Sequence, residues 1–261
     1  MTLLAYPQLP GGAPLQFPVE KRYRARTAVN VPADGRAIRL ADPQGELTEW
    51  RLEYAGLADS EILALEQFFG EAEGTLYEFT FLDPTENLFA WSGQLDNPAW
   101  SRDPFLTLTA GLPDPTGGAN AWHAANAGAA GQKLSQVLQA PAGYLYCLSI
   151  YARSSSPGSI SLLRGGARAE QTVDAEWRRL TFSGRGSAAD FIEFGIELPA
   201  GAAVDLFGPQ VEPQEAASVY KPSTLGGVYS RTHFQTDVLA STATGVNRHS
   251  VTVNLIHAKR L

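Results

Sequence analysis

The sequence predicts a mainly β protein, in which a β-sandwich or jelly roll is inserted into a first domain that packs one helix on a sheet. Residues 59–72 carry the one clear pattern of an amphipathic helix. Between residues 89 and 222, short apolar runs recur at regular intervals and are separated by turn residues, as in sandwiches and barrels. Strand patterns like those of the first part return after residue 223. We therefore expect two domains, residues 1–88 plus 223–261 and an insert of residues 89–222.

Length and charge agree with this organisation and exclude several classes of protein. A chain of 261 residues is long enough for two domains, and a hydrophobic content of 44% is typical of a globular protein. The net charge of −7 argues against a dedicated nucleic-acid binder. Cys147 is the single cysteine, so no intrachain disulfide forms, and its apolar surroundings predict a buried thiol. No apolar run predicts a membrane span, and the N-terminus does not have the pattern of a secretory signal.

The first part of the chain combines an extended arm with a basic strand. Residues 1–18 are rich in Pro and Gly, which favours an extended arm, and residues 20–31 favour a strand. The cations of this strand are Lys21, Arg22, Arg24 and Arg26. We favour a solvated strand edge for them; the alternative is an inter-subunit arm that meets acidic surface on a neighbouring copy. Asp34-Gly35 predicts a hairpin turn, and residues 42–45 predict a second turn.

Residues 49–84 form the centre of the first domain. Apolar and polar residues alternate over residues 50–55, the period of a half-buried strand. Asp59 is the expected helix N-cap, and Gly74 the residue that ends the helix. The apolar face of this helix consists of Ile62, Leu65, Phe68, Phe69 and Ala72. A second strand over residues 77–82 ends at Asp83-Pro84.

The insert and the C-terminal part are predicted as strands. In the insert we expect strands at 105–109, 133–138, 143–153, 159–163, 177–183, 191–198 and 203–211. Residues 124–131 are rich in Ala and Gly and are predicted as a loop. After the insert, residues 228–235 and 250–257 favour two further strands of the first domain.

No pattern in the sequence supports catalysis or a cofactor. The four His residues and Cys147 lack metal-ligand spacing, and no nucleophile elbow or phosphate loop is present. Glu193 and Glu197 face the same side of their strand, but four residues separate them by roughly 13 Å. Glycosidase carboxylates are about 5–5.5 Å or 6.5–9.5 Å apart. We predict a protein that is not an enzyme and that binds no metal or cofactor.

Sugar contact is the remaining chemistry, because the C–H face of a sugar packs on exposed aromatic rings. Trp122 lies in an expected loop, and Tyr151 and Arg153 are expected to point out of a strand whose Leu148 and Ile150 point inward. Trp177 is assigned to core packing. The candidate glycan contacts are Trp122, Tyr151, Arg153 and Glu193.

The strand–helix–strand stretch resembles the core of phage distal tail and minor tail-tip proteins. The matching residues are Trp50, Leu52, Leu57, Glu61, Leu65, Phe68, Phe69, Gly74, Phe79, Thr80, Phe81, Asp83 and Pro84. This resemblance implies a tail-tube-like β-sandwich with one flanking helix that assembles as a ring, commonly a hexamer. The implied partners are the tail tube protein and the tail hub and tip proteins, in the virion tail of a phage or a gene transfer agent. DNA would pass through the acidic lumen without specific binding.

The insert resembles the carbohydrate-binding-module-like jelly rolls found within phage tail and receptor-binding proteins. Residues 146–153, 176–182 and 208–212, followed by Tyr220 and Thr224, carry this likeness. It implies an outward sandwich that contacts host-surface polysaccharide or other tail proteins. The alternative is a free carbohydrate-binding or polysaccharide-depolymerising protein.

Overall fold

The computed structural model describes residues 4–10, 16–186 and 190–258, so parts of the expected N-terminal arm lie outside the described residues. The chain is mainly β, as predicted, and it divides into two compact units. Leu82–Val228 form the sandwich unit, and the described parts of Leu3–Phe81 and Tyr229–Leu261 form the helical unit. Whether the expected domains of residues 89–222 and of 1–88 plus 223–261 fold independently stays a prediction.

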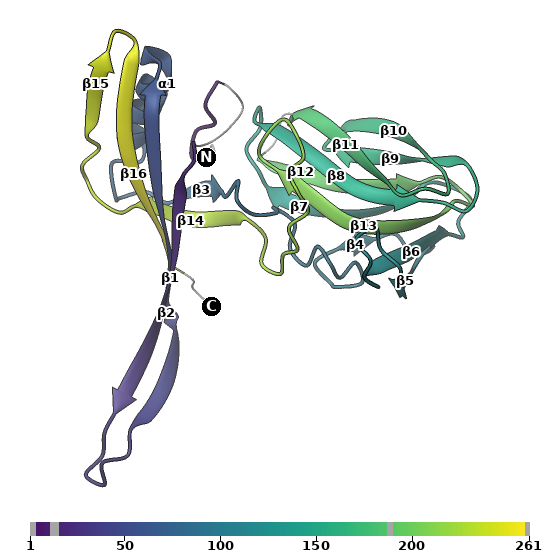
Figure 1. The fold of residues 1–261 in the computed structure, drawn as a ribbon, viewed down its shortest axis with the longest axis horizontal. Helices are drawn as coiled ribbons and strands as arrows, with labels where there is room; N and C mark the ends of the chain where they lie inside the picture. Colours follow the sequence, from purple (N-terminus) through teal and green to yellow (C-terminus); the bar gives the residue numbers. More distant parts are fainter. Residues whose placement is uncertain (1–3, 11–15, 187–189, 259–261) are drawn as a thin grey trace. The chain divides into compact units, whose positions relative to one another are not determined.

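The helical unit is built on a six-stranded sheet with helix α1 (Figure 1). Its strands follow the order β1-β2-β16-β14-β3, and β15 pairs with β16. The elements are β1 (Val19–Asn30), β2 (Ile38–Leu57), α1 (Asp59–Glu71), β3 (Phe79–Leu82), β14 (Val228–Phe234), β15 (Ser241–Gly245) and β16 (Arg248–Ala258). Every neighbouring pair whose register is described is antiparallel. The chain after the sandwich unit thus pairs directly with β2, because β16 lies beside it.

Aromatic packing holds the helix on this sheet. Ile62, Leu65 and Phe68 are the buried face of α1, as the sequence predicts. Phe68 packs edge-on against Phe79 at a ring separation of 5.0 Å. Trp50 contacts Phe81 in the same way at 5.1 Å. Phe79 packs against Phe234 at 5.1 Å, so the two chain segments of the unit, before and after the sandwich unit, share one core.

Two local predictions for the helical unit are wrong. The N-cap is Ala58, and Asp59 is the first helical residue; its carboxylate instead accepts a hydrogen bond from His249 at 2.6 Å. The backbone of Ala58 donates to the Glu61 carboxylate at 2.9 Å, which stabilises the helix start in place of an Asp cap. Strand β2 also runs through residues 42–45, where we expected a turn. The extra residues are absorbed by a register shift between Arg24 and Arg26 of β1.

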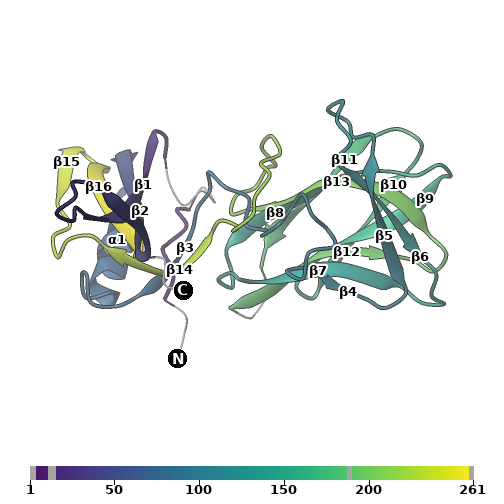
Figure 2. The ribbon, with the colours of Figure 1, turned by 90° about the horizontal axis from the view of Figure 1, so that it is seen from below.

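The sandwich unit consists of two five-stranded sheets (Figure 2). The first, called the β12 sheet, has the order β10-β9-β12-β7-β4, and the second, called the β8 sheet, has the order β11-β8-β13-β6-β5. The strands are β4 (Ser101–Arg102), β5 (Leu106–Leu112), β6 (Ala121–Asn126), β7 (Gln132–Gln139), β8 (Leu145–Arg153), β9 (Gly158–Arg164), β10 (Ala167–Val173), β11 (Arg178–Arg185), β12 (Phe191–Leu198) and β13 (Ala203–Glu212). The predicted loop over residues 124–131 is wrong in part, because Ala124–Asn126 pair with β5 and β13.

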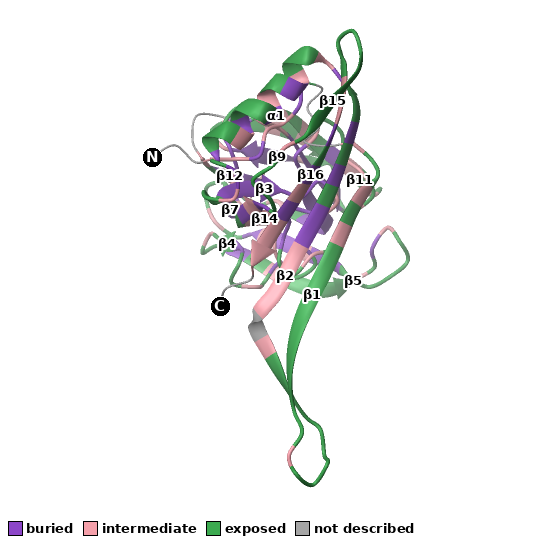
Figure 3. Cartoon of the chain, turned by 90° about the vertical axis from the view of Figure 1, so that its left-hand side faces the viewer, coloured by how far each residue is buried: buried purple, intermediate pink, exposed green. Residues whose placement is uncertain are grey.

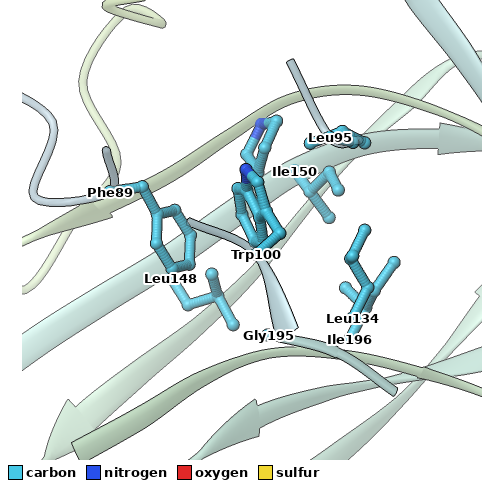
Figure 4. Close-up of a pocket in the computed structure, with 9 residues that line it drawn as sticks. Phe89, Leu95, Trp100, Leu134, Leu148, Ile150, Gly195 and Ile196 are labelled. Atoms are coloured by element: carbon cyan, nitrogen blue, oxygen red, sulfur yellow. The ribbon is translucent and has the colours of Figure 1, made fainter. Parts of the chain in front are cut away.

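Period-two alternation assigns the inner and outer faces of both sheets. Ile192, Phe194, Ile196 and Leu198 of β12 point into the core, as do Tyr146, Leu148, Ile150 and Ala152 of β8. Figure 4 shows a space inside this core, lined by Phe89, Trp100 and Leu134 among others. Its volume is about 10 Å³, which is too small for a ligand. This space therefore offers no site for a ligand in the core of the sandwich unit.

Two further observations complete the fold. Cys147 is buried, as predicted, and burial raises the pKa of its thiol. In the part of the chain that the structure describes, no helix is long and apolar enough to span a membrane.

Candidate functional site

The outer face of the β12 sheet contains a hollow of about 320 Å³. This hollow, called the Glu197 hollow below, is lined by Ser159, Ile160, Ser161, Arg168, Glu170, Glu197 and Pro199. Three neighbouring strands contribute all of these residues except Pro199, which follows β12, because β10, β9 and β12 lie side by side in this order. The volume falls within the range of small-molecule sites.

A network of hydrogen bonds fixes the polar side chains of the Glu197 hollow. The Nη2 group of Arg168 donates to Ser161 Oγ at 3.1 Å and to Glu197 Oε1 at 2.7 Å. Ser159 Oγ donates to Glu170 Oε1 at 2.6 Å. The guanidinium of Arg168 thus reaches across β9 and holds Glu197 in place. Both carboxylates keep lone pairs that can accept further hydrogen bonds.

Charge and shape define what this hollow can bind. Two carboxylates and one guanidinium give it a formal charge of −1, which disfavours anionic ligands. Its hydroxyls, carboxylates and guanidinium are donors and acceptors at fixed positions. Its lining contains no aromatic ring. The arrangement suits an uncharged, hydroxyl-rich molecule held by hydrogen bonds.

Glu193 lies on the same outer face of β12, two residues before Gly195 in the sequence. Ser135 Oγ donates to Glu193 at 2.8 Å, and Lys133 Nζ lies 3.5 Å from its other oxygen. Glu193 and Glu197 therefore point the same way, as the alternation predicts, but each has its own partners. Val137, 62% exposed, lies directly opposite Glu193, and Phe191, 61% exposed, follows further along this face opposite Gln139. From Glu197 to Phe191 the strand offers a polar and then an apolar surface roughly 20 Å long.

The outer face of the β8 sheet carries a row of paired side chains. Arg153 of β8 donates through Nε to Asp205 of β13 at 3.0 Å. The other carboxylate oxygen of Asp205 lies 2.8 Å from His123 Nδ1 on β6. At the opposite end of the row, the Arg153 guanidinium stacks on Trp177 at 4.7 Å. The row therefore runs across four strands or their ends.

The structure divides the predicted glycan contacts among three places. It brings Tyr151 and Arg153 together on the outer face of the β8 sheet, and it places Glu193 on the opposite sheet. Trp122 lies in β6 and not in a loop; the residue is 8% exposed and belongs to the core, and its Nε1 donates to Gly93 O at 3.1 Å. Burial removes Trp122 from the candidate surface. Trp177 was assigned to the core, but it lies half-buried outside the core cluster.

The sequence does not predict Arg168 and Glu170 as site residues, because residues 167–173 do not have a clear strand pattern. The signal was present, since Arg168, Glu170 and Thr172 alternate with smaller or less exposed residues. The run contains few of the β-branched and aromatic residues typical of strands.

The four cations of the predicted inter-subunit arm have partners within the chain. Lys21 Nζ donates to Tyr229 at 3.0 Å and lies over the Trp50 ring. The ion pairs are Arg22–Glu20, Arg24–Glu49 and Arg26–Asp42. The arginines remain exposed, so they can still form contacts at an interface, but they are not unpaired charges waiting for a partner.

Among the described residues, no group of three or more His, Cys, Asp and Glu side chains could hold a metal ion. No protein-family model matches the sequence, and no curated protein matches it.

Several solved structures are similar to the chain, all at low identity. The enzymatically active domain of tailspike protein 4 from bacteriophage CBA120 has a TM-score of 0.40 and 12% identity, over 51% of this chain and 22% of that one. The CBM22-1 xylan-binding domain of Paenibacillus barcinonensis Xyn10C has a TM-score of 0.40 and 15% identity, over 51% and 94%. A structure of TmCBM61 with β-1,4-galactotriose has a TM-score of 0.35 and 17% identity, over 48% and 97%. At these values, the function of this chain has to be argued from its own residues.

Proposed function

We propose that the sandwich unit binds carbohydrate, and that the Glu197 hollow is its principal contact site. The observation that carries this proposal is the Arg168–Glu197 pair, which fixes a guanidinium and a carboxylate in the lining of a ligand-sized hollow. A sugar presents adjacent hydroxyls that both donate and accept, and this side-chain set offers both functions without reorganisation.

The rest of the β12 face supports a ligand longer than one sugar ring. Glu193 and Ser135 extend the polar surface along the strand, and the exposed side chains of Val137, opposite Glu193, and of Phe191 beyond it add apolar surface. The C–H face of a sugar would pack there. The ligand class is therefore a neutral oligosaccharide or polysaccharide, such as those on host surfaces.

Binding of a panel of neutral oligosaccharides, measured by titration calorimetry on the full chain, tests this proposal. Glu197→Gln removes the charge that orients Arg168 and should weaken binding about tenfold, close to the value of one charge-assisted hydrogen bond. Glu71→Gln is the matched control, because Glu71 is an exposed residue at the end of α1. Equal affinities of the two variants for every sugar that binds would refute the hollow as the site.

A second candidate function rests on the helical unit. We propose that the chain is a structural component of a phage or phage-like tail tip, assembled as a ring between the tail tube and the hub proteins in the virion tail. The supporting observation is the β1–β2 hairpin, which is exposed on both faces beyond Asp42 (Figure 3). Val29, Ile38 and Leu40 in this part are 48–59% exposed.

Such a hairpin is typical of a segment covered by a partner, because an isolated two-stranded ribbon is marginally stable in water. Strand β1 is also an edge of its sheet, with pairing capacity left open. A ring of identical copies would cover both features. Light scattering of the purified chain, followed by electron microscopy of any rings, tests this candidate. A chain that stays monomeric at every concentration would contradict it.

A further inference from the structure

The second charged surface of the sandwich unit lies on the outer face of the β8 sheet, opposite the sheet that carries the Glu197 hollow. Two guanidiniums lie there on neighbouring strands. Arg179 of β11 is directly opposite Tyr151 of β8, and Arg153 follows two residues after Tyr151. Diagonal residue positions of this kind are about 7–8 Å apart. The Arg179 guanidinium extends towards Ser149, on the other side of Tyr151 from Arg153, so a ligand that contacts both guanidiniums spans the Tyr151 ring.

Each guanidinium keeps hydrogen-bonding capacity. Arg153 donates to Asp205 through Nε, and its Nη groups have no partner among the described residues. Arg179 donates through Nη2 to Ser149 Oγ at 3.0 Å, and its Nε is buried out of reach of a ligand, so its Nη1 group is the donor that remains for one. Because Asp205 is the one carboxylate that pairs with either arginine in the described chain, this pair carries a surplus positive charge. Guanidinium donors match the planar geometry of a carboxylate.

Two aromatic rings flank the arginines. Trp177 stacks on Arg153 at 4.7 Å, and Tyr151 lies 5.4 Å from the guanidinium of Arg179. Both rings are half-buried, so each keeps part of its surface accessible. Stacking holds both guanidiniums in place before a ligand binds. Ligand binding then costs less of the conformational entropy that a long side chain loses when it is ordered.

From this geometry we propose that the β8 face is a separate binding site for a sugar residue that carries a carboxylate, such as a uronic acid. The carboxylate accepts hydrogen bonds from Arg153 and Arg179, and the sugar ring packs on Trp177 or Tyr151. The site is independent of the Glu197 hollow and has the opposite charge preference. The sandwich unit would thus bind neutral sugars on one sheet and acidic sugars on the other.

Calorimetric titration of the full chain with tri-galacturonate tests this inference. Galactotriose serves as the uncharged counterpart, and triglutamate as an acidic peptide. Arg179→Gln and Trp177→Ala should each weaken tri-galacturonate binding about tenfold, the value of one charge-assisted contact or one buried ring face. Arg178→Gln is the matched control, because Arg178 has the same charge, is adjacent, and pairs with Asp174 instead. It should change the affinity less than about twofold.

Each contrary result is distinct. Absence of tri-galacturonate binding, or equal loss in Arg178→Gln and Arg179→Gln, would overturn the site. Equal binding of triglutamate would overturn the assignment to a sugar. Glu197→Gln separates this inference from the proposed function, because it should weaken neutral sugars and leave tri-galacturonate binding intact. Circular dichroism of each variant confirms that it is folded before its affinity is compared.

Discussion

Arg168 of β10 and Glu197 of β12 form an ion pair of 2.7 Å across the intervening strand β9. The side chain of Arg168 is 61% exposed and that of Glu197 19% exposed, so the pair lies at the boundary between the sheet and solvent. Ion pairs with this exposure contribute about 0–1 kcal/mol to stability. The main effect of the pair is therefore to position two groups in the hollow.

If the ion pair positions groups and does not stabilise the fold, Arg168→Gln should affect sugar binding more than the free energy of unfolding. We expect the free energy of unfolding to change by less than about 1 kcal/mol, because the lost pair is largely solvated. Affinity for a neutral oligosaccharide should fall by about tenfold, because Glu197 loses the donor that holds it. Urea unfolding and calorimetry on the same preparation measure both quantities. A variant that is strongly destabilised, or that binds normally, would show that the pair is structural.

Adding a side chain at Gly195 should strongly destabilise the sandwich unit. A Cβ at this position would overlap the carbonyl oxygen of Leu134 and lie 2.6 Å from Ser135 Cβ on β7. Since neither strand can move without breaking the ladder, Gly195→Ala should destabilise the sandwich unit by about 1–3 kcal/mol.

Gly166→Ala is the matched control, because a Cβ there meets no atom within 4 Å. The change in urea midpoint of the two variants is the measurement. Similar midpoints would mean that β7 and β12 do not approach each other as closely as the structure has them.

We expect the stability of the helical unit to depend on pH because of His257. Burial lowers the pKa of His257, and the neighbouring Arg231 and His233 side chains lower it further, against an opposing effect of Glu78. In the unfolded chain the pKa returns to about 6.5. The unfolded state therefore binds the proton more tightly, and the stabilisation by neutral His257 is complete above pH 6.5 and is lost as the pH falls through the folded pKa.

We expect thermal stability to decline on acidification below about pH 6.5 and His257→Gln to reduce that decline. Melting temperatures at a series of pH values measure the slope for each protein. An identical slope in the two proteins would exclude His257 as its origin.

From the arrangement of Glu193 and Glu197 we expect that sugar binding is not followed by hydrolysis. Each carboxylate is held by its own partners, Glu193 by Ser135 and Glu197 by Arg168, and Gly195 lies between them on the strand. We expect no release of reducing ends from polysaccharides that bind. Release that disappears in both Glu193→Gln and Glu197→Gln would instead favour the alternative of a depolymerising protein.

The sequence allowed prediction of those strands whose side chains alternate clearly. Strands β8 and β12 place large apolar residues on every second position, so their inner and outer faces could be assigned before the structure was known. Strands β6 and β10 consist largely of small or polar residues, and both were missed. The missed β6 explains the wrong placement of Trp122.

The site was harder to predict than the strands, because its contacts depend on strand order. Glu197 was recognised as an outer-face residue from the alternation alone. Its partner Arg168 is 29 residues away and reaches it because β9 lies between their strands. The arm cations show the same limit, since the partners Glu49 and Asp42 follow from the register of β1 with β2. Local patterns carry no information about such pairings.

The most direct test of carbohydrate binding by the Glu197 hollow is an NMR titration of the full chain with the neutral oligosaccharide that binds best. Backbone amide shifts report which strands contact the ligand. The account predicts saturable changes at Ser159, Ser161, Arg168, Glu170 and Glu197, with the outer residues of β8 and β13 unchanged. Changes confined to the β8 sheet, or none at saturating sugar, would contradict it.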